Sequence, residues 1–101
     1  MKVVNIKHGG TGHYIGRPGR GKKGSALANP FVLGKDGNRD TCCEKYRRWL
    51  WQQINAGNRA VLDELNVLRD TRPDLVCFCA PQKCHGDIII RCIDWMDRTL
   101  R

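Results

Sequence analysis

The chain has 101 residues, of which 41% are hydrophobic and 28% are charged, and its formal net charge is +8. This length predicts one domain with a modest core and leaves no room for a second catalytic domain. No apolar run approaches the length of a membrane span, and the first residues, MKVVNIKHGG, lack the apolar stretch of a signal peptide. We therefore expect no membrane partner and a cytoplasmic location.

The positive charge is concentrated in the first part of the chain. Residues 1–39 hold eight Lys or Arg against one acid, whereas residues 40–101 hold ten against nine. Such asymmetry indicates an anionic partner, such as a phosphorylated small molecule, a nucleotide or a nucleic acid.

The first predicted elements are short and β-prone. Residues 3–6 (VVNI) predict a first strand, and a glycine-rich basic loop follows over residues 9–28. Within this loop, residues 13–17 (HYIGR) are compatible with a second short strand. Residues 17–24 (RPGRGKKG) are not, because glycine costs backbone entropy and proline lacks a donor. Residues 28–34 (ANPFVLG) return to a β-prone composition.

Two helices are predicted next. Thr41 and Glu44 form a T-x-x-E capping box for a helix that begins at residues 40–41. Gly57 fits the position just after the end of this helix. Asn58 can cap a second amphipathic helix, and Pro73 ends it.

The last elements complete an α/β pattern. Residues 75–79 (LVCFC) predict a short buried strand, and Asp87 is predicted to cap a final helix. The chain therefore predicts a small single α/β domain over residues 1–101, with its helical and strand core in residues 40–101. The expected architecture is a short, mostly parallel sheet flanked by about three helices, with a Rossmann-like partial topology.

Three of the six cysteines gather between the last strand and the last helix. Cys77 and Cys79 lie two apart on a strand and are expected on one face of it. Cys84, His85 and Asp87 fall where open α/β sheets bind ligands, beyond the carboxyl ends of strands. A thiol at a helix N-terminus has a lowered pKa, so Cys84 is the predicted nucleophile, with His85 as acid or base.

Two other interpretations of these cysteines stay open. Cys77, Cys79, Cys84 and His85 are the right types for a zinc site, although the spacing C-x-C-x₄-C-H is poor for one ion. Alternatively, the strand cysteines pack as small hydrophobic residues, which is also the expectation for three cysteines on helices: Cys42, Cys43 and Cys92. We predict no cofactor and no bound metal.

The glycine-rich loop carries a dense basic cluster: Arg17, Arg20, Lys22 and Lys23. Such side chains can hold a phosphate by charge-assisted hydrogen bonds. The cluster does not match G-x-x-x-x-G-K-[ST], and a solvated loop is an equally good interpretation of its composition.

The segments YIGRP, NPFV, YRRWL and LVCFCAP, followed by CHGD, together resemble a small bacterial and phage family known as DUF4326. The resemblance extends from Val3 to about Trp95. The GRGKKGSA insertion departs from the family pattern. The C-terminal segment is also similar to a second family, DUF488, in which Cys-His-Arg opens the helix, whereas this chain has Cys-His-Gly.

The resemblance supplies no activity, but it implies one site built from six residues: Arg17, Asn29, Cys79, Cys84, His85 and Asp87. We expect this site to bind a phosphorylated or nucleotide-like ligand. The expected ligand-binding residues are Gly16, Arg17, Arg20, Asn29, Cys79 and Gly86. If a reaction occurs, its expected catalytic residues are Cys84, His85 and Asp87. A non-enzymatic nucleic-acid-binding protein, led by the basic segment, and a structural zinc protein are the alternatives.

Overall fold

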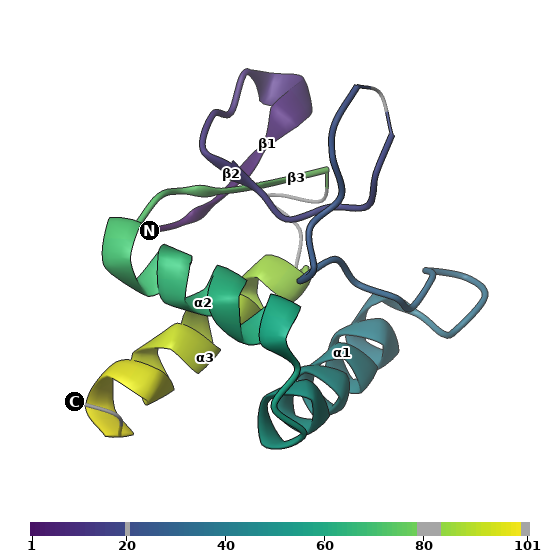
Figure 1. The fold of residues 1–101 in the computed structure, drawn as a ribbon. Coiled ribbons are helices and arrows are strands. Elements are labelled where there is room, and N and C mark those ends of the chain that lie inside the picture. Colours follow the sequence, from purple (N-terminus) through teal and green to yellow (C-terminus); the bar gives the residue numbers. More distant parts are fainter. Residues whose placement is uncertain (20, 79–83, 100–101) are drawn as a thin grey trace.

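The computed structural model describes residues 1–19, 21–78 and 84–99 (Figure 1). The elements in chain order are β1 (Val3–Asn5), a 3₁₀ turn η1 (Ile6–His8), β2 (His13–Tyr14), α1 (Arg39–Asn55), α2 (Arg59–Thr71), β3 (Leu75–Cys77) and α3 (His85–Thr99). None of the helices in these ranges is long and apolar enough to cross a membrane.

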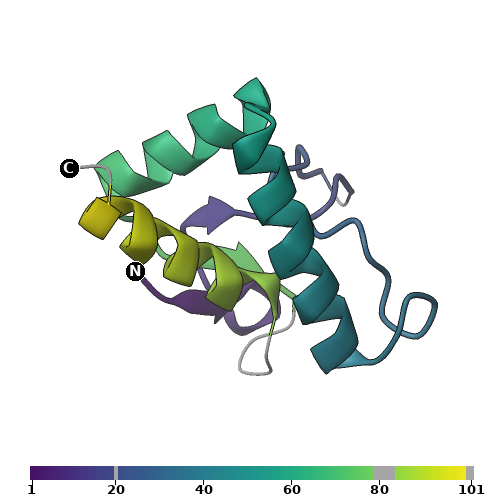
Figure 2. The same cartoon turned by 90° about the horizontal axis from the view of Figure 1, so that it is seen from below.

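The three strands form one parallel sheet in the order β1-β3-β2. Val76 in the central strand aligns with Val4 of β1 and with Tyr14 of β2. The three helices lie together on one side of the sheet (Figures 1 and 2). This confirms the predicted small α/β fold. The central strand, β3, is apolar and buried at all three positions. Because all three strands are parallel, their carboxyl ends meet at one edge.

The start of α1 differs from the prediction. Asn38 is the capping residue, and its side-chain oxygen accepts the Thr41 N–H at 2.9 Å. Glu44 instead forms ion pairs along the helix surface with Arg47 at 2.6 Å and Arg48 at 3.5 Å. The predicted capping box is therefore wrong, because an asparagine three residues earlier already supplies the cap.

The junction between α1 and α2 follows the prediction. Gly57 lies just beyond α1 with a φ of 73°, a left-handed conformation that favours glycine. The Asn58 side chain accepts the Val61 N–H at 3.4 Å and caps α2. The helix ends at Thr71, two residues before Pro73.

The β-prone segment at residues 28–34 forms turns rather than a strand. The Asn29 side chain accepts the Phe31 N–H at 2.9 Å, and the Asp36 side chain accepts the Val32 N–H at 2.7 Å. Such local side-chain bonds satisfy the backbone donors that strand pairing would otherwise use.

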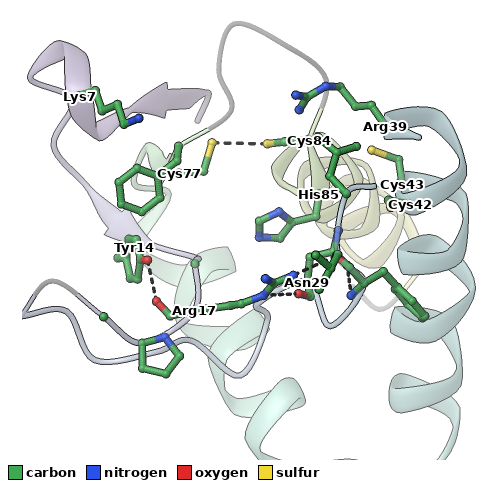
Figure 3. Close-up of a pocket in the computed structure, with 17 residues that line it drawn as sticks. Lys7, Tyr14, Arg17, Asn29, Arg39, Cys42, Cys43, Cys77, Cys84 and His85 are labelled. Atoms are coloured by element: carbon green, nitrogen blue, oxygen red, sulfur yellow. Dashed lines mark hydrogen bonds between the residues drawn. The ribbon is translucent and has the colours of Figure 1, made fainter. Parts of the chain in front are cut away.

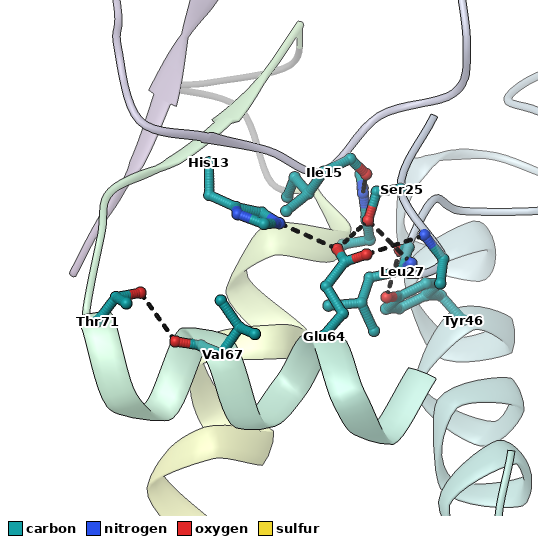
Figure 4. A network of polar contacts seen from close by, with 10 residues as sticks. His13, Ile15, Ser25, Leu27, Tyr46, Glu64, Val67 and Thr71 are labelled. Atoms are coloured by element: carbon teal, nitrogen blue, oxygen red, sulfur yellow. Dashed lines mark hydrogen bonds and ion pairs between the residues drawn. The ribbon is translucent and has the colours of Figure 1, made fainter. Parts of the chain in front are cut away.

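The glycine-rich loop is attached to α2 by part-buried hydrogen bonds to Glu64 and to α1 by a buried hydrogen bond from Tyr46 (Figure 4). Glu64 of α2 accepts hydrogen bonds from the Ser25 hydroxyl, from the Ala26 N–H at 3.1 Å and from His13 Nε2 at 3.2 Å. The fully buried Tyr46 of α1 donates its hydroxyl to the Leu27 carbonyl at 2.7 Å. The end of the loop is thus held against the core, although most of its residues are polar or glycine.

Candidate functional site

A cavity of about 540 Å³ lies at the edge where the strands end (Figure 3). Its walls come from η1, the loop after β2, the first turn of α1, the end of β3 and the residues that open α3. This volume lies within the range of small-molecule binding sites. The position agrees with the general rule that open α/β sheets bind ligands beyond the carboxyl ends of their strands.

Three cationic side chains line the cavity: Lys7 of η1, Arg17 of the loop after β2, and Arg39 at the start of α1. They approach it from three sides (Figure 3). No Asp or Glu belongs to the wall, as far as the structure describes it. Because these charges converge in a concave, partly apolar site, their positive potential is reinforced.

Arg17 and Asn29 together shape the turn that borders the cavity. Arg17 donates from Nε to the Asn29 carbonyl at 3.0 Å and from Nη2 to the Phe31 carbonyl at 2.9 Å. Tyr14 in turn donates its hydroxyl to the Arg17 carbonyl at 2.7 Å. Both of these acceptors are uncharged backbone carbonyls, so they do not neutralise the positive charge that Arg17 brings to the cavity wall.

Cys77 and Cys84 form a close thiol pair in the same wall (Figure 3). Their sulfur atoms are 3.5 Å apart, and the two residues are 2% and 3% exposed. Cys77 ends β3 and Cys84 immediately precedes α3, so the sheet and the helix each contribute one sulfur.

The first turn of α3 is capped by Cys84, so the prediction that Asp87 is the cap was wrong. Cys84 Sγ accepts the Gly86 N–H at 3.3 Å, and the Asp87 carboxylate accepts the Cys84 N–H at 3.2 Å. This reciprocal pattern resembles a capping box in which cysteine replaces serine or threonine. The Asp87 N–H also bonds to the Cys84 carbonyl at 3.1 Å, so the backbone N–H groups of Gly86 and Asp87 are both engaged within the turn.

Two glycines of the predicted site allow close packing. A Cβ atom at Gly86 would lie 2.7 Å from Val3 Cγ2 and 3.1 Å from Ile15 Cδ1, so α3 begins directly against the strands. A Cβ atom at Gly16 would clash with the Tyr14 hydroxyl oxygen. Gly16 belongs to the cavity wall, whereas Gly86 does not.

His85 lines the cavity but is only 7% exposed. Its Nε2 donates to the Ile15 carbonyl at 2.8 Å, because a carbonyl can only accept, and this assigns a proton to Nε2. The ring meets Tyr46 edge-on, with 5.1 Å between ring centres. Burial raises the pKa of Tyr46 well above its ordinary value, so this hydroxyl stays protonated. His85 therefore ties α3 to the chain leaving β2.

The predicted site is thus partly assembled. Five of its members line the cavity: Gly16, Arg17, Asn29, Cys84 and His85. Gly86 and Asp87 belong to the first turn of α3 but not to the described wall, and Arg20 and Cys79 fall outside the described residues. Zinc requires Cys79 to join Cys77, Cys84 and His85. Within the described ranges, no group of three or more His, Cys, Asp or Glu side chains is placed to hold a metal ion.

Sequence reasoning missed two of the three cations, Lys7 and Arg39. Lys7 directly follows the first predicted strand, and the fold turns this segment toward the cavity (Figure 3). A signal for Arg39 was present, because recognising Asn38 as the helix cap would have placed Arg39 in the first turn of α1.

The comparisons with known proteins bear on the family alone. No curated protein and no solved structure matches the chain. The family described as "Domain of unknown function (DUF4326)" matches residues 4–95, which include every residue of the cavity wall named above. The motifs singled out from the sequence lie within this range, and the chain belongs to the DUF4326 family.

Proposed function

We propose that the cavity binds a small phosphorylated ligand of nucleotide size. The observation that carries this proposal is the convergence of Lys7, Arg17 and Arg39 on a cavity whose described wall holds no carboxylate. A phosphate monoester carries a charge of about −1.5 to −2 at neutral pH and has three strong acceptor oxygens. Three cations from separate parts of the fold match such a group in both charge and number of donors.

The rest of the wall supports a ligand that has an apolar, planar part besides its phosphate. Tyr14, Phe31 and Phe78 line the cavity, and Tyr14 meets Phe78 edge-on, with 6.2 Å between ring centres. Binding sites commonly combine apolar and aromatic walls with a few placed polar groups. A nucleotide combines a phosphate with a ring that can stack on such walls.

Cysteine-dependent group transfer or hydrolysis at this site stays a prediction. Cys84 lines the cavity and would be the nucleophile, and His85 lies beside it in the same wall. Asp87 would act indirectly, because its carboxylate positions the Cys84 backbone N–H. A Cys84→Ser variant that turns over an identified substrate at the wild-type rate would remove Cys84 from the mechanism.

The proposal is tested by calorimetric titration of the reduced protein with adenosine, guanosine, cytidine and uridine monophosphates, the parent nucleosides and inorganic phosphate. Arg39→Gln removes one cation from the wall, and Arg48→Gln is its matched control on the exposed surface of α1. A charge-assisted hydrogen bond contributes about 1.5–3 kcal/mol. We therefore expect Arg39→Gln to weaken binding by roughly ten- to a hundredfold and Arg48→Gln to leave it unchanged.

Absence of binding by all these phosphates, or equal affinities in the two variants, would refute the proposal. The nucleic-acid alternative makes a different prediction for the same proteins. It requires oligonucleotide affinity that falls steeply with salt and depends on Lys22 and Lys23, both of which are exposed, rather than on Arg39.

A further inference from the structure

The thiol pair in the cavity wall has a geometry that invites covalent chemistry between its two sulfurs. Cys77 Sγ and Cys84 Sγ are 3.5 Å apart and are not joined by a disulfide. A disulfide bond is about 2.05 Å long, so the sulfurs must approach by roughly 1.5 Å. Both side chains are nearly fully buried, but both line the cavity. A small oxidant that enters the cavity can therefore reach the two sulfurs.

The two sulfurs differ in their surroundings. Cys84 Sγ lies at the N-terminus of α3 and accepts the Gly86 N–H at 3.3 Å. A backbone donor and the positive end of a helix both favour a negatively charged sulfur. Cys84 is therefore the better nucleophile of the pair, and Cys77 is within reach to react with whatever forms on Cys84.

We infer that Cys84 and Cys77 are a reversible dithiol site for hydroperoxides. The Cys84 thiolate attacks one peroxide oxygen, the O–O bond breaks, and protonation of the other oxygen releases water from hydrogen peroxide. This leaves Cys84 as a sulfenic acid. The Cys77 sulfur then attacks the Cys84 sulfur, the S–O bond breaks, and a second water leaves with the Cys77 proton. The two thiols are oxidised by two electrons overall, and the peroxide is reduced.

Oxidation of the pair would change the chemistry available in the cavity. A Cys77–Cys84 disulfide withdraws the nucleophile predicted from the sequence, and a dithiol reductant restores it by thiol–disulfide exchange. The inference does not require the ligand proposed above. Failure of nucleotide binding leaves the disulfide measurement intact, and failure of disulfide formation leaves the nucleotide titration intact.

Cys92 provides an internal control on the same helix. Burial raises the pKa of its thiol to about 11, so Cys92 stays protonated near neutral pH. It belongs to a second hollow, between α1 and α3, where it lies with Trp51 and Trp95 rather than in the cavity. Peroxide is therefore expected to spare Cys92 while it oxidises the pair.

The test treats the reduced, full-length protein with hydrogen peroxide near neutral pH, blocks the remaining thiols and maps disulfides by peptide mass spectrometry. Cleavage after Phe78 and after Lys83 separates Cys77, Cys79 and Cys84 into different peptides. Wild type and Cys92→Ser are expected to give the Cys77–Cys84 linkage as the main product, reversed by dithiothreitol. Cys77→Ser is expected to accumulate a Cys84 sulfenic acid that dimedone traps.

A parallel reaction of wild type unfolded in urea provides a second comparison, which does not depend on whether any variant folds. Unfolding removes the fixed 3.5 Å approach of the two sulfurs, so the Cys77–Cys84 linkage should lose its preference over the other short-range pairings, Cys77–Cys79 and Cys79–Cys84. The inference is overturned if native wild type forms no disulfide. It is also overturned if Cys84 pairs with Cys79, or if the native and unfolded chains give the same mixture of linkages.

Discussion

Tyr46→Phe removes a single buried hydroxyl that holds the glycine-rich loop on the core. The Tyr46 side chain is fully buried, and its hydroxyl donates to the Leu27 carbonyl at 2.7 Å. The phenylalanine ring fills nearly the same space, so the main loss is one hydrogen bond. The Leu27 carbonyl then stays buried without a donor. Removing one partner of a buried hydrogen bond costs about 1–3 kcal/mol of unfolding free energy.

Tyr14→Phe makes the same chemical change at an accessible position. The Tyr14 hydroxyl donates to the Arg17 carbonyl at 2.7 Å, but this bond is exposed. Water can replace the donor there, so we expect a loss within about 0.5 kcal/mol. The expected difference between the two variants therefore arises from burial and not from the hydroxyl itself.

Urea denaturation, followed by the fluorescence of the tryptophans, measures both losses. Tyr46→Phe should lower the urea midpoint clearly, with an unchanged slope, and Tyr14→Phe should leave it close to wild type. Equal midpoints for the two variants would refute the view that Tyr46 anchors the loop through a buried bond.

The pKa of Tyr46 adds a second signature to the same experiment. Burial raises this pKa in the folded protein well above its ordinary value. An unfolded tyrosine loses its proton near pH 10, whereas the folded one keeps it. Its contribution to stability is therefore complete below that pH and is lost as the pH rises further. When the pH is raised from about 9.5 to about 11, the unfolding free energy of Tyr46→Phe should therefore fall less than that of wild type.

Two further predictions concern packing and acid stability. Gly86→Ala should lower the unfolding free energy by about 1–2 kcal/mol, because the added Cβ meets Val3 at 2.7 Å and Ile15 at 3.1 Å. This clash outweighs the better helix propensity of alanine. A thermal melt at or above the wild-type midpoint would contradict this. Hydrogen bonds from Arg72 and then Arg69 lower the pKa of Asp97 in the folded state. Wild type therefore loses this stabilisation as the pH falls below about 4, and Asp97→Asn should lose less stability over the same range. Identical acid titrations of wild type and variant by circular dichroism would count against it.

The parts of the fold that depend on local pattern were predictable from the sequence. Three features each have a short-range signal, and the structure has all three: Gly57 just beyond α1, the cap of α2 at Asn58, and the buried strand that includes Cys77. The helix starts were less predictable because several residues compete for the cap. Asn38 precedes Thr41, and Cys84 precedes Asp87, and in both cases the earlier residue is the cap.

The site could be predicted only where its residues are close in sequence or belong to one motif. Arg17 and Asn29 were expected together, and the guanidinium does reach the Asn29 carbonyl. Lys7 and Arg39 join them only because three parallel strands bring separate segments to one edge of the sheet. The closeness of Cys77 and Cys84 likewise depends on how α3 packs against β3, which no local spacing specifies.

The central claim is that the cavity is the binding site, and nuclear magnetic resonance of ¹⁵N-labelled, reduced protein tests it most directly. Titration with a nucleoside monophosphate should shift the amide signals of Gly16, Asn29 and Cys84, which line the cavity. The indole signals of Trp51 and Trp95, at the second hollow, should stay in place. The uncharged nucleoside should shift the cavity signals far less at the same concentration. Shifts confined to the tryptophans, or equal shifts with and without the phosphate, would contradict the account.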